Sequence, residues 1–182
     1  MKLPLPKDLG VEFRRFLDIC LFRKRPQDLP AAIGLFWLAV MSYTILSIVL
    51  CFSTQSIIIA MLCGIIESVV LLFITFVFLY LRSVPQRWIQ VATALAGTGA
   101  VFSLIVIPLY YARGFLQASP TADSLIVMTI IFFWFWNISV MSFILKHGLS
   151  SSYLLAALGA LAYVAISMLS LQKIITVSQS IT

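Results

Sequence analysis

Five long apolar stretches restrict the fold of this chain more than any other feature of the sequence. Each is about as long as the ~20 residues that a helix needs to cross a bilayer core. None shows the alternation of apolar and polar residues that a barrel strand requires. The sequence therefore predicts an all-α membrane protein, a bundle of five transmembrane helices preceded by a short amphipathic helix at the interface. The predicted spans are residues 31–51, 57–81, 88–112, 124–145 and 151–171.

Composition favours a membrane protein over a soluble one. Hydrophobic residues make up 62% of the 182 residues and charged residues only 10%, whereas a soluble domain carries about 25% charged residues. We divide the chain into a basic cytoplasmic segment (1–29), a transmembrane domain (30–173) and a short tail on the other side (174–182). The net charge of +6 is spread between the apolar runs, without a basic stripe, so no nucleic-acid partner is expected.

Lysine and arginine predict the orientation, because short cytoplasmic loops are enriched in them. Ten of the twelve fall before the first span or in the loops after the second and fourth spans. Only Arg113 and Lys173 fall on the other side. We expect the N-terminus in the cytoplasm and the C-terminus outside, most simply in a bacterial inner membrane.

The N-terminal segment predicts a helix on the membrane surface. Phe13, Phe16, Leu17 and Cys20 have the spacing of one helical face, and cations on the other faces would contact lipid headgroups. A docking helix for a partner protein is the alternative. The residues expected at the headgroups are Arg14, Arg15, Arg23, Lys24 and Arg25.

Glu67 is the one acid inside a predicted span, and a charge there costs several kcal/mol. Counting from the span ends puts other polar side chains at a similar depth. They form an intramembrane band of Glu67, Ser42, Tyr43, Thr98, Asn137 and Tyr163. The band either lines a cavity for an ion, proton or polar headgroup, or serves only to lock the bundle. In the second case Glu67 is a neutral acid bonded to Asn137 or a tyrosine.

Small residues spaced by four predict close helix contacts, because they let backbones approach. Packing within the chain is the main expectation, and a homodimer contact is the alternative. The predicted packing residues are Ala60, Gly64 and Ser68 in the second span, Ala96 and Ala100 in the third, and Ala156 and Ala160 in the fifth. Pro108 should kink or end the third helix. The aromatic run 132–136 predicts core filling and lipid contact, or a surface for another membrane subunit.

Signals for catalysis are weak, so we expect no enzyme and no cofactor. His147 is the only histidine, and no metal-binding or nucleophile motif is present. The sequence instead predicts a membrane-organising or accessory subunit that binds lipid, another membrane protein or itself. A small transporter or channel using Glu67 is the alternative.

Two stretches resemble the Yip family of Rab-interacting, five-span membrane proteins. One runs from Trp134 through Asn137, Lys146 and His147 to the small residues 156–157, and the other covers 94–100. The resemblance implies a five-span fold with little soluble mass. The short N-terminal segment is more similar to the bacterial relatives than to eukaryotic members, so Rab binding does not transfer.

Overall fold

The computed structural model describes residues 9–115 and 120–181, and this part of the chain is helical without a strand. The predicted all-α class is confirmed. The elements are α1 (Leu9–Cys20), the short 3-10 turn η1 (Pro26–Asp28), α2 (Ile33–Phe52), α3 (Ile57–Leu81), a second turn η2 (Pro85–Arg87), α4 (Trp88–Phe115), α5 (Pro120–Gly148) and α6 (Tyr153–Ile181).

Five of these helices, α2 to α6, are long and apolar enough to cross a membrane. The predicted starts of the second and third spans coincide with those of α3 and α4. Pro108 does not end α4, which continues to Phe115. The last helix begins at Tyr153 and continues to Ile181, so the described part of the predicted tail 174–182 is helical.

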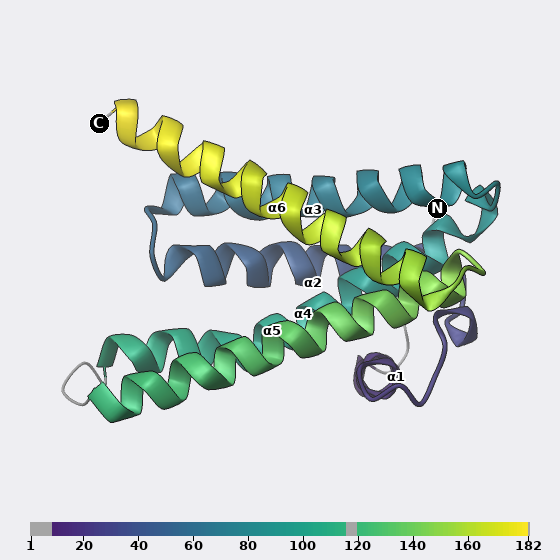
Figure 1. The fold of residues 1–182 in the computed structure, drawn as a ribbon, viewed down its shortest axis with the longest axis horizontal. Coiled ribbons are helices and arrows are strands. Elements are labelled where there is room, and N and C mark those ends of the chain that lie inside the picture. The colour runs from purple at the N-terminus through teal and green to yellow at the C-terminus, as the bar shows by residue number, and fades with distance from the viewer. Residues whose placement is uncertain (1–8, 116–119, 182) are drawn as a thin grey trace.

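The long helices pack as two antiparallel hairpins crossed by the last helix (Figure 1). One hairpin is α2–α3 and the other is α4–α5, while α6 runs diagonally and packs against α3 and α5. α4 is the central helix, because 72% of its apolar window is buried, against 17% for α5 and 22% for α6. The two hairpins diverge towards the end where α4 connects to α5.

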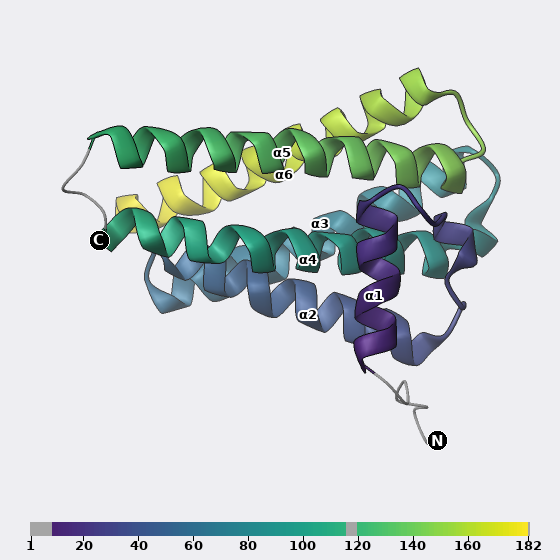
Figure 2. The same cartoon turned by 90° about the horizontal axis from the view of Figure 1, so that it is seen from below.

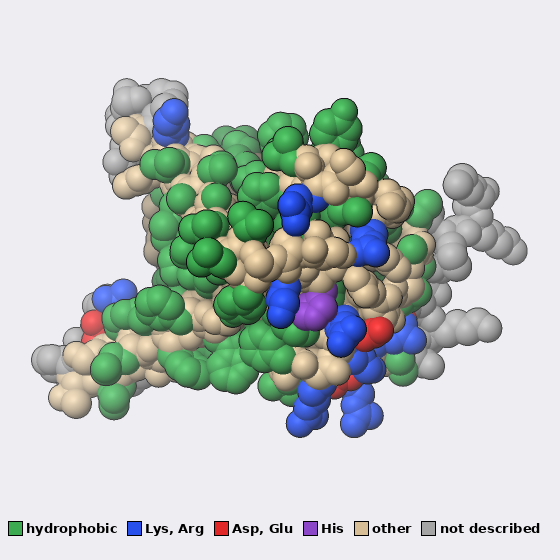
Figure 3. Space-filling model, turned by 45° about the vertical axis from the view of Figure 1, so that its right-hand side comes forward, with side chains coloured by type: hydrophobic (Ala, Val, Ile, Leu, Met, Phe, Trp, Pro, Cys, Tyr) green, Lys and Arg blue, Asp and Glu red, His purple; other side chains and the backbone are tan. Residues whose placement is uncertain are grey.

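The two ends of the bundle differ in charge. One end, called the basic end here, carries the connections before α2, between α3 and α4, and between α5 and α6. Figure 3 shows cationic side chains gathered there around His147. The described cations in these connections and helix ends are Arg23, Lys24, Arg25, Arg82, Arg87 and Lys146. At the opposite end Arg113 pairs with Asp123, with Nε 2.7 Å from Oδ1.

Helix α1 packs crosswise on α4 near the basic end (Figure 2). Its buried side chains are Phe16, Ile19 and Cys20, whereas Phe13 is 43% exposed. The Phe16 ring lies so close to Gly97 that any Cβ there would overlap it. Part of the apolar face predicted to rest on lipid therefore rests on the chain's own central helix.

Burial at the end of α1 also changes the chemistry of Cys20. The Trp136 Nε1 donates a hydrogen bond of 3.0 Å to the Cys20 carbonyl oxygen, which joins α5 to the end of α1. Loss of hydration on burial disfavours a thiolate and raises the pKa of the Cys20 thiol to about 12.

Candidate functional site in the middle of the bundle

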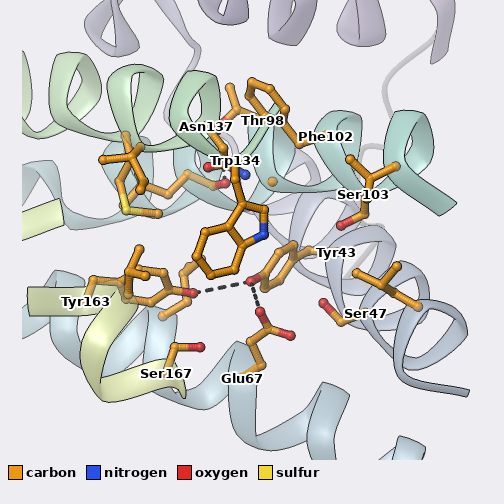
Figure 4. Close-up of a pocket in the computed structure, with 18 of the residues that line it drawn as sticks. Tyr43, Ser47, Glu67, Thr98, Phe102, Ser103, Trp134, Asn137, Tyr163 and Ser167 are labelled. Carbon is orange, nitrogen blue, oxygen red and sulfur yellow. Dashed lines mark hydrogen bonds between the residues drawn. The ribbon is translucent and has the colours of Figure 1, made fainter. Parts of the chain in front are cut away.

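Three side chains from three helices form a hydrogen-bonded cluster midway along the bundle. The Tyr43 hydroxyl of α2 donates to Glu67 Oε1 of α3 at 3.0 Å. The same hydroxyl lies 3.2 Å from the Tyr163 hydroxyl of α6. Figure 4 shows this cluster with Tyr43 at its centre. The tyrosine partner is one of the two that the sequence analysis proposed for Glu67.

Gly99 of α4 makes room for the Tyr43 ring. A Cβ at position 99 would lie 2.8 Å from Cε2 and 2.9 Å from Cδ2 of that ring, closer than carbon atoms pack. The cluster therefore also depends on α4, because the Tyr43 ring fits only where position 99 has no side chain. Sequence reasoning placed Gly99 only near the small-residue face of the third span and did not predict its contact with Tyr43, because helical spacing does not reveal which residue of a neighbouring helix it meets.

The cluster forms one wall of a cavity of about 220 Å³ to which all five long helices contribute. All five band residues named as site candidates line it: Tyr43, Glu67, Thr98, Asn137 and Tyr163. Ser42 is not among the lining residues, whereas Ser47, Ser103 and Ser167 are. Counting depth along the helices thus predicted the correct level, but it could not show that Tyr43 of α2 faces the cavity and its neighbour Ser42 does not.

Thr98 and Asn137 differ in how their polar atoms are bonded. Thr98 Oγ1 donates to the Ala94 carbonyl oxygen at 2.8 Å, within its own helix. Asn137 is half-buried at the cavity wall, and its side chain makes no hydrogen bond to any residue in the described parts of the chain. Its amide can therefore bond a ligand without breaking a protein contact.

The cavity extends from this polar level towards the end opposite the basic end. On α4 its lining continues from Thr98 through Phe102 to Tyr110, and on α6 from Tyr163 to Leu171. Towards the basic end the core is closed by fully buried side chains, among them Leu79, Val91, Val140 and Ile144. The polar cluster thus lies at the closed end of the cavity.

Trp134 of α5 points into the same space as Tyr43 and Tyr163 (Figure 4). Its neighbours Phe132 and Phe135 are 54% and 68% exposed on the outside of α5. The aromatic run 132–136 therefore divides between the cavity, the outer surface and, through Trp136, the contact with α1.

The predicted small-residue faces lie in helix contacts within the chain. Gly64 packs against α2, where a Cβ would lie 3.0 Å from the Ile48 nitrogen and 3.1 Å from the Thr44 carbonyl oxygen. Ser68 Oγ lies 2.7 Å from Thr44 Oγ1 in the same contact. The remaining members are buried, with exposed fractions from 0% to 8%: Ala60, Ala96, Ala100, Ala156 and Ala160.

The basic residues assigned to lipid headgroups lie on or next to α1. Arg15 pairs with Glu12 at 2.8 Å and Lys24 with Asp18 at 2.9 Å. The other three, Arg14, Arg23 and Arg25, are exposed. Since exposed pairs contribute at most about 1 kcal/mol, these side chains leave a positive surface rather than a rigid network.

Metal and catalytic groups are not concentrated anywhere in the described residues. No group of three or more His, Cys, Asp or Glu side chains is close enough to hold a metal within 9–115 and 120–181. His147 lies at the basic end, where its Nδ1 is 2.9 Å from the Phe143 carbonyl oxygen.

Fold and site together define a class, an all-helical bundle with five helices fit to span a membrane and a cavity at their middle. Comparisons with protein-family models, curated proteins and solved structures find no match. The resemblance to the Yip family stays a prediction.

Proposed function

We propose that this chain is a non-enzymatic integral membrane protein that binds a small ligand in the Glu67 cavity, as the binding site of a small transporter. The observation that carries the proposal is convergence: polar side chains from all five long helices line one cavity. Locking the bundle would require only bonds such as that of Tyr43 with Glu67. It would not require a cavity next to them, since empty space in a protein core is destabilising.

The proposed location is a bacterial cytoplasmic membrane with the basic end in the cytoplasm. Support comes from the cations of the short connections at that end, which match the usual enrichment on the cytoplasmic side. In this orientation the cavity extends away from the cytoplasm, and exposed Arg14, Arg23 and Arg25 contact the anionic headgroups of the inner leaflet.

Native mass spectrometry of protein purified in mild detergent tests the proposal. Wild-type protein should retain a small-molecule adduct acquired in the cell, and Ser103→Trp should lose it because the indole fills the cavity. Phe73→Trp is the matched control, since Phe73 is 65% exposed on α3 and does not line the cavity. No adduct on wild type, or an equal adduct on both variants, would contradict ligand binding.

An accessory or membrane-organising subunit is the second candidate. The observation that favours it is the outer face of α5, where Phe132 and Phe135 are exposed side by side with Leu125 and Met128. A photo-crosslinking residue at position 135 should then capture a membrane protein in cells, and one at position 73 should not. Equal capture at both positions would remove the reason to assign a partner to α5.

A further inference from the structure

Among the described residues Glu67 has no cationic partner, although Tyr43 donates a hydrogen bond to its carboxyl group. The sequence has no Lys or Arg from residue 33 to 81, from 88 to 112, or from 124 to 145. The ion pairs of the described residues join Arg15, Lys24 and Arg113 to other acids. An ionised Glu67 would therefore be an uncompensated charge at low dielectric, which is costly unless something neutralises it.

The cavity offers aromatic surface next to this carboxyl group. Tyr43, Tyr163 and Trp134 point into it (Figure 4), and Phe102 and Phe133 line it further out. Aromatic faces attract cations, tryptophan most strongly, and the attraction grows as the cation loses its hydration. A carboxylate combined with aromatic faces is the chemistry that recognises alkylated ammonium groups.

The outer part of the lining suits the apolar groups of an organic ligand better than a bare metal ion. Beyond the polar level most lining side chains are apolar, for example Leu50, Val106 and Leu171. Hard cations require six or more oxygen ligands, and these side chains supply none. With a volume of about 220 Å³ the cavity is smaller than the ~300–1,000 Å³ of pockets for drug-sized ligands.

The route to the cavity also suits a cation. The cavity extends towards the end where the described cations are Arg113, which is paired with Asp123, and Lys173. The basic end, where a cation would be repelled, is closed by buried side chains. Charge and packing therefore favour entry of a positively charged ligand from the same side.

We infer that the cavity binds a small lipophilic ammonium ion, whose charged group pairs with Glu67 beside the Trp134 ring and whose apolar groups lie against Phe102. The inference rests on the proposed function and adds the class of ligand to it. Asn137 and Ser167 provide bonding groups beside the charge site and select among ammonium ions by their polar substituents.

A binding experiment with tritiated benzyltrimethylammonium tests this inference. Scintillation proximity measures its binding to the purified full-length protein in a neutral maltoside detergent. Wild type should bind the probe saturably, and Glu67→Gln should lower the affinity at least about 30-fold, because an amide cannot neutralise the charge. Trp134→Leu should lower it about fivefold through the lost cation–π contact. Asp123→Asn, the matched carboxyl-to-amide control at the opposite end, should change it less than about twofold.

Unlabelled competitors separate charge from shape. Benzyltrimethylammonium should displace the tritiated probe, and its neutral isostere 2,2-dimethyl-1-phenylpropane should not. Equal competition by both, together with unchanged binding by a folded Glu67→Gln variant, would overturn the ammonium inference and leave ligand binding in place. Absence of saturable binding to wild type would also overturn it, and the proposed function would fall as well only if the cellular adduct were missing.

Discussion

The half of the bundle next to the basic end is closely packed, whereas the opposite half contains the cavity. Fully buried side chains concentrate in the first half, including Leu79, Val91, Ile144 and Ala156. The second half contains the outer part of the cavity, which is lined for example by Phe102 and Val106 of α4 and by Leu171 of α6. The same five helices build both halves, so the difference comes from side-chain size and from the divergence of the hairpins. One half can thus hold the helices while the other accommodates a ligand.

The largest effect that we predict is on the reactivity of the Cys20 thiol, which tests how closely the packed half excludes water. Only a thiolate reacts with maleimide, so a pKa of about 12 should lower the labelling rate at pH 8 roughly 1,000-fold below that of an exposed thiol. The sign follows from burial, which disfavours the charged form, so labelling should become faster as pH rises. The measurement uses a variant in which Cys51 and Cys63 are replaced by alanine.

Undocking of α1 should abolish that protection. Phe16→Ala removes the ring that rests on Gly97 and should bring the Cys20 rate close to that of the same protein denatured in dodecyl sulfate. Val11→Ala is a matched control, because Val11 is 50% exposed on the same helix. Rapid labelling of the folded parent would show that α1 is not packed on α4 as described.

Added volume should be tolerated differently in the two halves. Ala96→Leu on α4 places three extra carbons where the exposed fraction is 0%, and overpacking of this kind costs typically about 1–3 kcal/mol. Ser103→Leu, two turns further along the same helix, places its side chain in the cavity and should cost less than about 0.5 kcal/mol. Equilibrium unfolding in dodecyl sulfate gives both values, and equal costs would argue against the contrast between the halves.

Removing hydroxyl groups from the cluster at the boundary between the halves should give the smallest difference in the free energy of unfolding between two paired variants. Tyr43→Phe removes the bonds to both Glu67 and Tyr163, whereas Tyr163→Phe removes the bond between the tyrosines and leaves that of Tyr43 with Glu67 in place. Since such bonds average about 0.6 kcal/mol in membranes, the first variant should lose about 1 kcal/mol of unfolding free energy and the second about half of that. A reversed order would mean that Tyr43 is not the centre of the cluster.

Helix class and polar depth could be predicted from the sequence because both follow from regular geometry. Apolar runs of sufficient length must form helices in lipid, and a constant rise per residue placed Tyr43, Glu67 and Asn137 at one level. The faces could not be predicted, as Ser42 and Ser47 illustrate, because helix rotation depends on packing partners distant in the sequence. The same limit applies to the contact of Gly99 with Tyr43 and to the docking of Phe16 on Gly97.

The length of the later helices was underestimated for a related reason. Hydropathy marks where a helix enters the apolar layer, but a helix continues while its backbone bonds remain favourable. α5 begins at Pro120, a residue suited to a first turn, and α6 continues past Lys173 to Ile181. Each extension contains a charged residue, Asp123 in α5 and Lys173 in α6, so the predicted apolar spans end before the helices do.

Accessibility of engineered cysteines from each side of the membrane tests the central claim most directly. The experiment uses three variants of a protein that lacks Cys20, Cys51 and Cys63: Ser103→Cys, Ser167→Cys and Ser142→Cys. Each is treated in sealed vesicles of known orientation with a membrane-impermeant cationic thiosulfonate. The cavity-lining positions 103 and 167 should react from the side opposite the basic end, while position 142, 2% exposed in the packed half, should not react from either side. Reaction of 103 and 167 from the basic side, or failure of both to react, would contradict a cavity that opens away from the basic end.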